Sequence, residues 1–199
     1  MYSSRILREI TVTLLIAIAN LLVYAYTSLA GGDFLVTSDF ALLSYGQLNH
    51  SVLNGEYWRL FTAMFIHTNI VHLLGNIFFL IVFGLRAEEL FSKAEYLAIY
   101  FLSGLTGNIL TLALGPTVLS AGASGAIFGI FGACTIFIRR TLGQSLFGAL
   151  LYAFFLLTIT GTTPNVNILA HFGGLIAGLI LGYVFSSKRE HNATYRLLH

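Results

Sequence analysis

Charged residues are scarce in this sequence. Asp, Glu, Lys and Arg make up only 9% of the 199 residues, whereas hydrophobic residues make up 57%. A soluble domain carries charge at about a quarter of its positions, so this composition excludes a soluble globular protein. The net charge of +2 and the lack of a basic cluster also exclude nucleic acid as a partner.

Cysteine is almost absent as well. Cys134 is the single cysteine of the chain, so an intrachain disulfide is excluded. It lies inside an apolar run, where we expect a buried thiol that fills space in the core.

The hydrophobic residues occur in long runs bounded by charges or by Gly and Pro, which is typical of transmembrane helices. We therefore predict an all-α, polytopic membrane bundle that forms one domain over residues 1–199. Its six transmembrane helices are expected at about 8–27, 68–85, 95–114, 122–138, 145–160 and 168–186. Arg5 and Arg8 precede the first run as in a signal peptide, but no small-residue cleavage site follows it, so we expect that helix to be retained.

The basic residues predict the orientation of this bundle. Six spans place both termini on one side of the membrane, together with nine of the ten basic residues; only Arg59 falls on the other side. The positive-inside rule makes the shared side cytoplasmic. The nine residues are Arg5, Arg8, Arg86, Lys93, Arg139, Arg140, Lys188, Arg189 and Arg196.

One long connection, at about residues 28–66, lies outside in this topology. It is rich in Leu, Phe and Tyr and ends in Tyr57-Trp58-Arg59. We expect it to lie partly in the membrane interface, with Trp58 as an anchor at headgroup depth.

Three polar residues stand inside the predicted spans, where such residues are costly and indicate function. Ser124, His171 and His72 precede the cytoplasmic charges of their helices by about 14 to 17 residues, or roughly 21 to 25 Å of helix rise. Since all three helices run from outside to inside, these side chains are expected at one depth below the outer surface. Glycines at 125 and 129, and at 174, 178 and 182, predict close packing of the fourth and sixth helices, which would bring Ser124 to His171.

These residues predict a serine hydrolase. A serine hydroxyl becomes a nucleophile when a base takes its proton, and His171 can be that base. Ser124 lies in Gly122-Ala123-Ser124-Gly125 at the start of a helix, where free backbone N–H groups can face an oxyanion. His72 and Asn76, one helical turn apart, are further candidate donors. Metal ligation is not expected, because the His-Glu-x-x-His motif of zinc proteases is missing.

Each residue alone also has a structural interpretation. A membrane serine often bonds to a helix carbonyl, and His or Asn often joins neighbouring helices. A transporter is disfavoured because the spans lack a charged pair and an inverted repeat. Haem binding by His67 and His72 is disfavoured because residues five apart are expected on diverging faces of a helix.

The ordered set of motifs resembles the rhomboid family of intramembrane serine proteases, in its minimal six-helix form. The resemblance covers essentially the whole chain. It rests on Trp58-Arg59, on His67, His72 and Asn76, on the segment from Gly84 to Glu88, on Gly122-Ala123-Ser124-Gly125, and on Ala170-His171-Phe172-Gly173-Gly174 with Gly178.

The resemblance implies a catalytic dyad of Ser124 and His171 without an acidic third member. It implies oxyanion stabilisation by Asn76, His72 and the Ser124 N–H, a structural role for the first loop, and a gate formed by the fifth helix. It implies no cofactor, a lipid bilayer and transmembrane-helix substrates as partners, and cleavage near the outer face. A catalytically inactive relative that binds transmembrane helices is the alternative.

One position departs from the pattern of some family members. They carry a Tyr that stacks on the catalytic His, where this chain has Phe128. A Phe ring can pack against the imidazole but has no hydroxyl. The short tails favour a prokaryotic plasma membrane, with the site open to the outside.

Overall fold

The computed structural model describes residues 11–29, 31–142 and 166–198. These residues are mostly helical, and two short strands join distant parts of the chain. In chain order the elements are α1 (Val12–Leu29), α2 (Asp39–Tyr45), β1 (Gln47–Leu48), α3 (Asn49–Leu53), α4 (Arg59–Thr62), α5 (Ile70–Leu90), α6 (Lys93–Thr111), β2 (Leu119–Ser120), α7 (Ser124–Leu142) and α9 (Ile168–Leu198).

Four helical segments of the described chain are long and apolar enough to cross a membrane. They are Val12–Leu29, Ile70–Leu90, Lys93–Leu114 and Ile168–Ser187, and they match four of the predicted spans. Helix α7 occupies the predicted fourth span, and the predicted fifth span at about 145–160 lies outside the described residues. A helical membrane bundle is thus confirmed, and the number of six spans stays a prediction.

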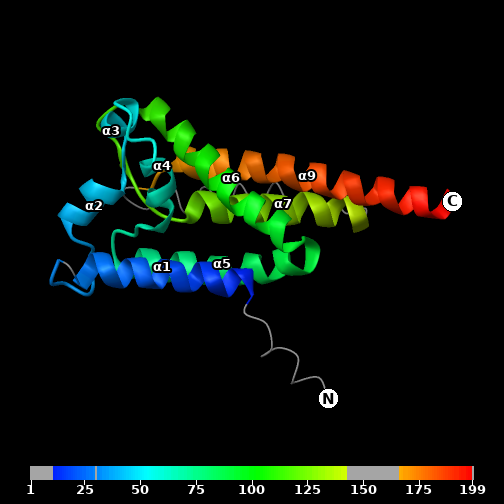
Figure 1. The fold of residues 1–199 in the computed structure, drawn as a ribbon, viewed down its shortest axis with the longest axis horizontal. Coiled ribbons are helices and arrows are strands. Elements are labelled where there is room, and N and C mark those ends of the chain that lie inside the picture. The colour runs from blue at the N-terminus through cyan, green and yellow to red at the C-terminus, as the bar shows by residue number, and fades with distance from the viewer. Residues whose placement is uncertain (1–10, 30, 143–165, 199) are drawn as a thin grey trace, which may run out of the picture.

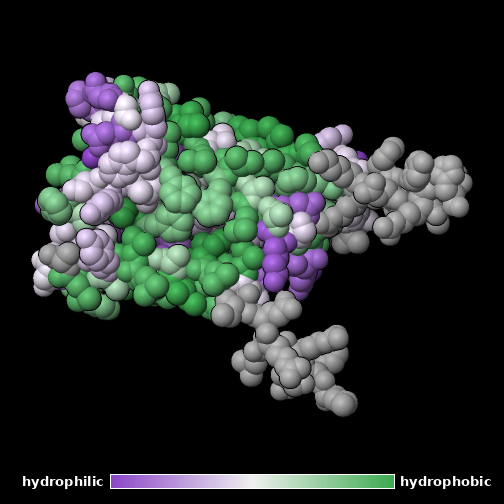
Figure 2. All heavy atoms as spheres, in the orientation of Figure 1, coloured by the Kyte–Doolittle hydropathy of each residue, from purple (hydrophilic) through white to green (hydrophobic). Residues whose placement is uncertain are grey.

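The surface is consistent with a bundle that lies in a membrane. In Figure 2 a broad apolar band separates hydrophilic residues at one end, over α3 and its neighbours, from those near the other end. Figure 1 places the start of α1 and the end of α9 at the same end of the bundle. The side of the membrane that this end faces stays a prediction from the basic residues.

Glycines bring α7 and α9 into backbone contact. A Cβ at Gly174 or Gly178 would collide with the carbonyl oxygen of Gly125 or Gly129, respectively. Helices without a hydrophobic driving force between them associate through such close packing. The predicted contact between the fourth and sixth helices is therefore confirmed.

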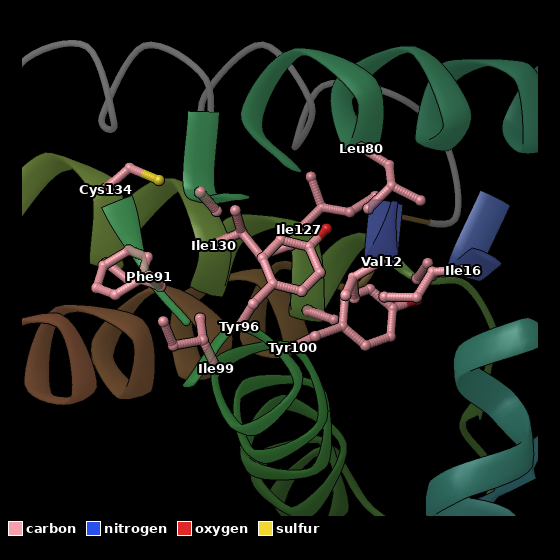
Figure 3. Close-up of a cluster of buried hydrophobic side chains, with 14 of the residues drawn as sticks. Val12, Ile16, Leu80, Phe91, Tyr96, Ile99, Tyr100, Ile127, Ile130 and Cys134 are labelled. Atoms are coloured by element: carbon pink, nitrogen blue, oxygen red, sulfur yellow. The ribbon is translucent and has the colours of Figure 1, made fainter. Parts of the chain in front are cut away.

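The core lies where α6 crosses α1 and α7 (Figure 3). Tyr96 and Tyr100 of α6 are fully buried there, and a cysteine fills the same core from α7. Cys134 is 5% exposed and therefore buried, as predicted. The neighbouring apolar side chains are Val12, Ile16, Leu80, Ile99, Ile127 and Ile130.

The connection predicted at about 28–66 is folded, with three short α-helices, a 3-10 helix and a strand. Arg59 is buried and donates from Nη1 to the carbonyl oxygens of Leu43 and Gly46, at 2.7 and 3.0 Å. Its Nε donates to Glu56 at 2.6 Å. The guanidinium carbon also lies 4.8 Å from the centre of the Trp58 ring. These bonds join the short elements of the segment to one another.

Helix α9 differs from the prediction at its end. The charges at Lys188 and Arg189 were expected to end this helix, yet it continues to Leu198. No Gly or Pro occurs between Tyr183 and Leu198, and basic residues are good helix formers. Charge therefore marks where the apolar span ends, and the helix itself is free to continue.

Candidate active site

Ser124 is placed by the turn that joins β2 to α7. Gly122 in this turn has φ +127°, a conformation that favours glycine. A Cβ at Gly122 would lie 2.9 Å from both Cε1 and Nε2 of His72. The turn therefore needs glycine for its backbone shape and for the close approach of this imidazole.

The connection between α1 and α5 holds the turn in place. Strands β1 and β2 are antiparallel, with Gln47 opposite Ser120 and Leu48 opposite Leu119. The Gly122 N–H also donates to the carbonyl oxygen of Ala63, at 2.9 Å. The residues just before Ser124 are thus held by pairing with β1 and by the bond to Ala63.

Asn167 fixes the beginning of α9, which carries His171. Its Oδ1 accepts from the Ala170 N–H at 3.1 Å, as the cap of the first helical turn. Its Nδ2 donates to Thr111 Oγ1 at 2.7 Å and to Ser120 Oγ at 2.9 Å. One side chain therefore joins α9 to the end of α6 and to the strand that leads to Ser124.

Asn167 was not among the residues predicted from the sequence. Its signal was present, because an Asn directly before an apolar periodic run is typical of a helix N-cap. The sequence did not show that the same amide would reach two other segments.

The structure brings Ser124 and His171 together. The Nε2 of His171 lies 2.7 Å from the Ser124 hydroxyl, across 47 positions of sequence. His171 is 5% exposed, and the Phe128 ring stacks on its imidazole with centroids 4.6 Å apart. A neutral imidazole at this distance can accept the hydroxyl proton, which is the geometry that an activated serine needs.

His72 and Asn76 lie in the first two turns of α5. The His72 imidazole reaches the serine turn at Gly122. Asn76 is buried, and its Nδ2 donates to the backbone carbonyl of His72 at 2.9 Å. Because an amide nitrogen carries two N–H groups, this bond leaves Asn76 one donor for another acceptor.

The His67 side chain contacts that of His72. Their rings meet edge to face with centroids 5.2 Å apart, so the expectation of diverging helix faces is wrong. The physical reason is that His67 precedes α5, which begins at Ile70. Burial, and next the proximity of His72, lower the pKa of His67 from 6.5 to about 3.

A metal site was not expected here. Within residues 11–29, 31–142 and 166–198, no group of three or more His, Cys, Asp or Glu side chains is placed to hold a metal ion.

Comparison with known proteins identifies the family. The rhomboid domain model matches residues 54–188. The chain is 34% identical over 175 residues to RHOMBOID-like protein 1 of Arabidopsis thaliana, covering 84% of this chain and 45% of that protein. It is 37% identical over 148 residues to the putative rhomboid protease YdcA of Bacillus subtilis, covering 71% of this chain and 74% of YdcA. A third relative is the rhomboid protease GluP of B. subtilis, 31% identical over 176 residues.

The lengths of these relatives differ from that of this chain. The chain spans about half the length of the Arabidopsis relatives and a third of GluP, whereas it spans most of YdcA. The matched region of 54–188 contains Ser124, His171, His72 and Asn76. The match to the domain, together with the apolar helices, shows that this chain is a membrane protein of the rhomboid family.

Proposed function

We propose that this protein is an intramembrane serine endopeptidase with Ser124 as nucleophile and His171 as general base. The hydrogen bond of 2.7 Å between their side chains carries the proposal. Serine within reach of a buried imidazole is the minimum that acyl transfer needs, and related rhomboid proteins bear the name protease.

The reaction is acyl transfer to the serine. His171 accepts the Ser124 proton as the oxygen attacks the scissile carbonyl, and it then protonates the leaving amine. Water releases the acyl group with His171 again as base. An acidic third residue usually orients such a histidine; here the cap at Asn167 and the stacked Phe128 ring support that task.

The oxyanion is stabilised by His72, Asn76 and the backbone N–H of Ser124. The first N–H groups of a helix lack helical partners, and Ser124 begins α7. The His72 imidazole lies close to Gly122 in the serine turn, which supports its role as an oxyanion donor. Asn76 contributes its second N–H.

The substrates are transmembrane helices, cleaved near the outer face of the bilayer. A helical peptide bond is shielded by its own hydrogen bonds, so the substrate unwinds locally before cleavage. The basic residues support cytoplasmic termini and a site that opens to the outer side of the membrane.

Cleavage of a labelled transmembrane substrate by purified protein in detergent tests this function. The comparison includes wild type, Ser124→Ala, His171→Ala and a control, Ser186→Ala. The control serine is buried, lies in α9 and only bonds the Tyr183 carbonyl of its own helix. We expect cleavage by wild type and Ser186→Ala alone; equal cleavage by all four proteins would contradict the dyad.

A catalytically inactive member that binds transmembrane helices is the alternative function. Labelling by a fluorophosphonate probe separates the two, because the probe reacts with an activated serine. Labelling that is lost in Ser124→Ala supports the protease. Substrate binding without labelling or cleavage supports the alternative.

A further inference from the structure

A chain of hydrogen bonds ends at the Nδ1 of His72, the ring nitrogen other than the one nearest Gly122. The Nδ1 of His72 is 3.2 Å from the Thr68 hydroxyl. Asn69 Nδ2 is 3.4 Å from the same hydroxyl oxygen. The Oδ1 of Asn69 accepts from the His72 backbone N–H at 2.8 Å. Three residues thus form one continuous chain that returns to the histidine.

The helix cap sets the direction of this chain. A backbone N–H only donates, so the Asn69 atom that faces the His72 N–H must be the amide oxygen. The amide nitrogen of Asn69 then faces Thr68 and donates to its oxygen. The N-cap position of Asn69 on α5 makes this orientation a consequence of where the helix begins.

The orientation of Asn69 favours one direction for the bond between Thr68 and His72. Asn69 occupies one of the two lone pairs of the Thr68 oxygen, whereas the hydroxyl proton is available to His72. When the hydroxyl donates, the Nδ1 of His72 accepts, and in the neutral ring the proton lies on Nε2. That nitrogen is the one that approaches the serine turn at Gly122.

The neighbours of Thr68 support a fixed geometry. The Thr68 carbonyl accepts from the Thr37 N–H at 3.0 Å, and Val36 pairs with Asn69 in an antiparallel bridge. His67, whose ring meets that of His72, has a pKa lowered to about 3 by burial. It is therefore neutral and brings no positive charge to the His72 ring.

We propose that Thr68 is a positioning residue that keeps His72 in the Nε2–H tautomer, so that this imidazole donates a hydrogen bond to the oxyanion. The proposal rests on the proposed function, in which His72 is such a donor. It adds a residue that touches no substrate and acts through His72.

The test compares wild type with Thr68→Val, Thr68→Ser and Thr106→Val. Valine keeps the shape of threonine without the hydroxyl, and serine restores the hydroxyl. Thr106→Val is the control, because this exposed hydroxyl only bonds the Leu102 carbonyl of its own helix. Nitrogen-15 NMR at pH 8 of protein with labelled histidine reports the tautomer of His72, assigned by the signals that vanish in His72→Gln.

In wild type, Thr68→Ser and Thr106→Val we expect an unprotonated Nδ1 and a protonated Nε2 on His72. In Thr68→Val we expect a mixture of the two tautomers. The kcat of Thr68→Val should fall about three- to tenfold with little change in KM, which is less than the loss of roughly 10²–10³-fold for removing an oxyanion donor altogether. An Nδ1–H signal in wild type, or an unchanged His72 spectrum in Thr68→Val, would overturn the proposal.

The two readouts separate this proposal from the proposed function. The tautomer of His72 is measured without catalysis, so it tests Thr68 even in a protein that cleaves nothing. A changed tautomer with unchanged kcat would overturn the link from Thr68 to the oxyanion, while the Ser124–His171 dyad stands. The cleavage assay of the Ser124 and His171 variants tests the proposed function and does not depend on the Thr68 result.

Discussion

The Phe128 ring lies flat on the His171 imidazole, with ring centroids 4.6 Å apart and an angle of 24° between the planes. Phe128 is one helical turn beyond Ser124 on α7, so the helix that carries the hydroxyl also supports the imidazole that faces it. The ring restricts rotation of His171 without a hydrogen bond, which explains how a residue without a hydroxyl serves at this position.

Replacing Phe128 by Leu should lower kcat by about two- to tenfold, because stacked aromatic pairs contribute roughly 0.5–1.5 kcal/mol. Phe128→Tyr keeps the ring and should retain most of the activity. Steady-state cleavage of a transmembrane substrate measures both variants. Equal rates for Phe128→Leu and wild type would show that stacking does not position His171.

Replacing Asn167 by Ala should destabilise the protein by about 2–4 kcal/mol, from the lost cap and the lost bonds to Thr111 and Ser120. Asn167→Ser keeps an oxygen for the cap and should lose about half as much. Unfolding titrations in mixed detergent give the free energy, and cleavage assays give the rate. The same stability for Ala and Ser variants would show that the cap contributes nothing.

Two helical glycines should respond to alanine in opposite directions. Gly178→Ala places a Cβ against the Gly129 carbonyl and should destabilise the bundle by about 1–3 kcal/mol. Gly75 has open space around its Cα, so Gly75→Ala should be neutral or stabilise by about 0.5–1 kcal/mol. Thermal unfolding in detergent tests the pair, and a stable Gly178→Ala protein would contradict backbone contact between α7 and α9.

The stability of the protein should fall as pH decreases from 6.5 toward 3, in part through His67. Its pKa is lowered from 6.5 to about 3, so in this range the unfolded chain binds a proton that the folded protein excludes. The unfolding free energy of wild type should therefore depend on pH more steeply than that of His67→Gln, by up to about 1.4 kcal/mol per pH unit. Parallel slopes for the two proteins between pH 4 and 6 would show that His67 is not buried and neutral.

Much of the fold was predictable because hydropathy is a local property. The apolar runs predicted the four helices that are long enough to span a membrane, with ends a few residues away from those observed. Helix α9 passed its predicted end because charge stops an apolar span without stopping a helix. The folded connection between α1 and α5 was less predictable, since Arg59 holds it through backbone carbonyls whose positions no local pattern reveals.

A helical membrane protein was predictable from the linear pattern, and so was the set of Ser124, His171, His72 and Asn76, because polar residues inside apolar runs are visible without a structure. The fold was needed to show that Ser124 and His171 are in hydrogen-bond contact, that Asn167 joins three segments, and that His67 meets His72. Those relations depend on the rotamers and backbone contacts of helices that are distant in sequence. A linear pattern fixes which groups are available, and close packing fixes which of them touch.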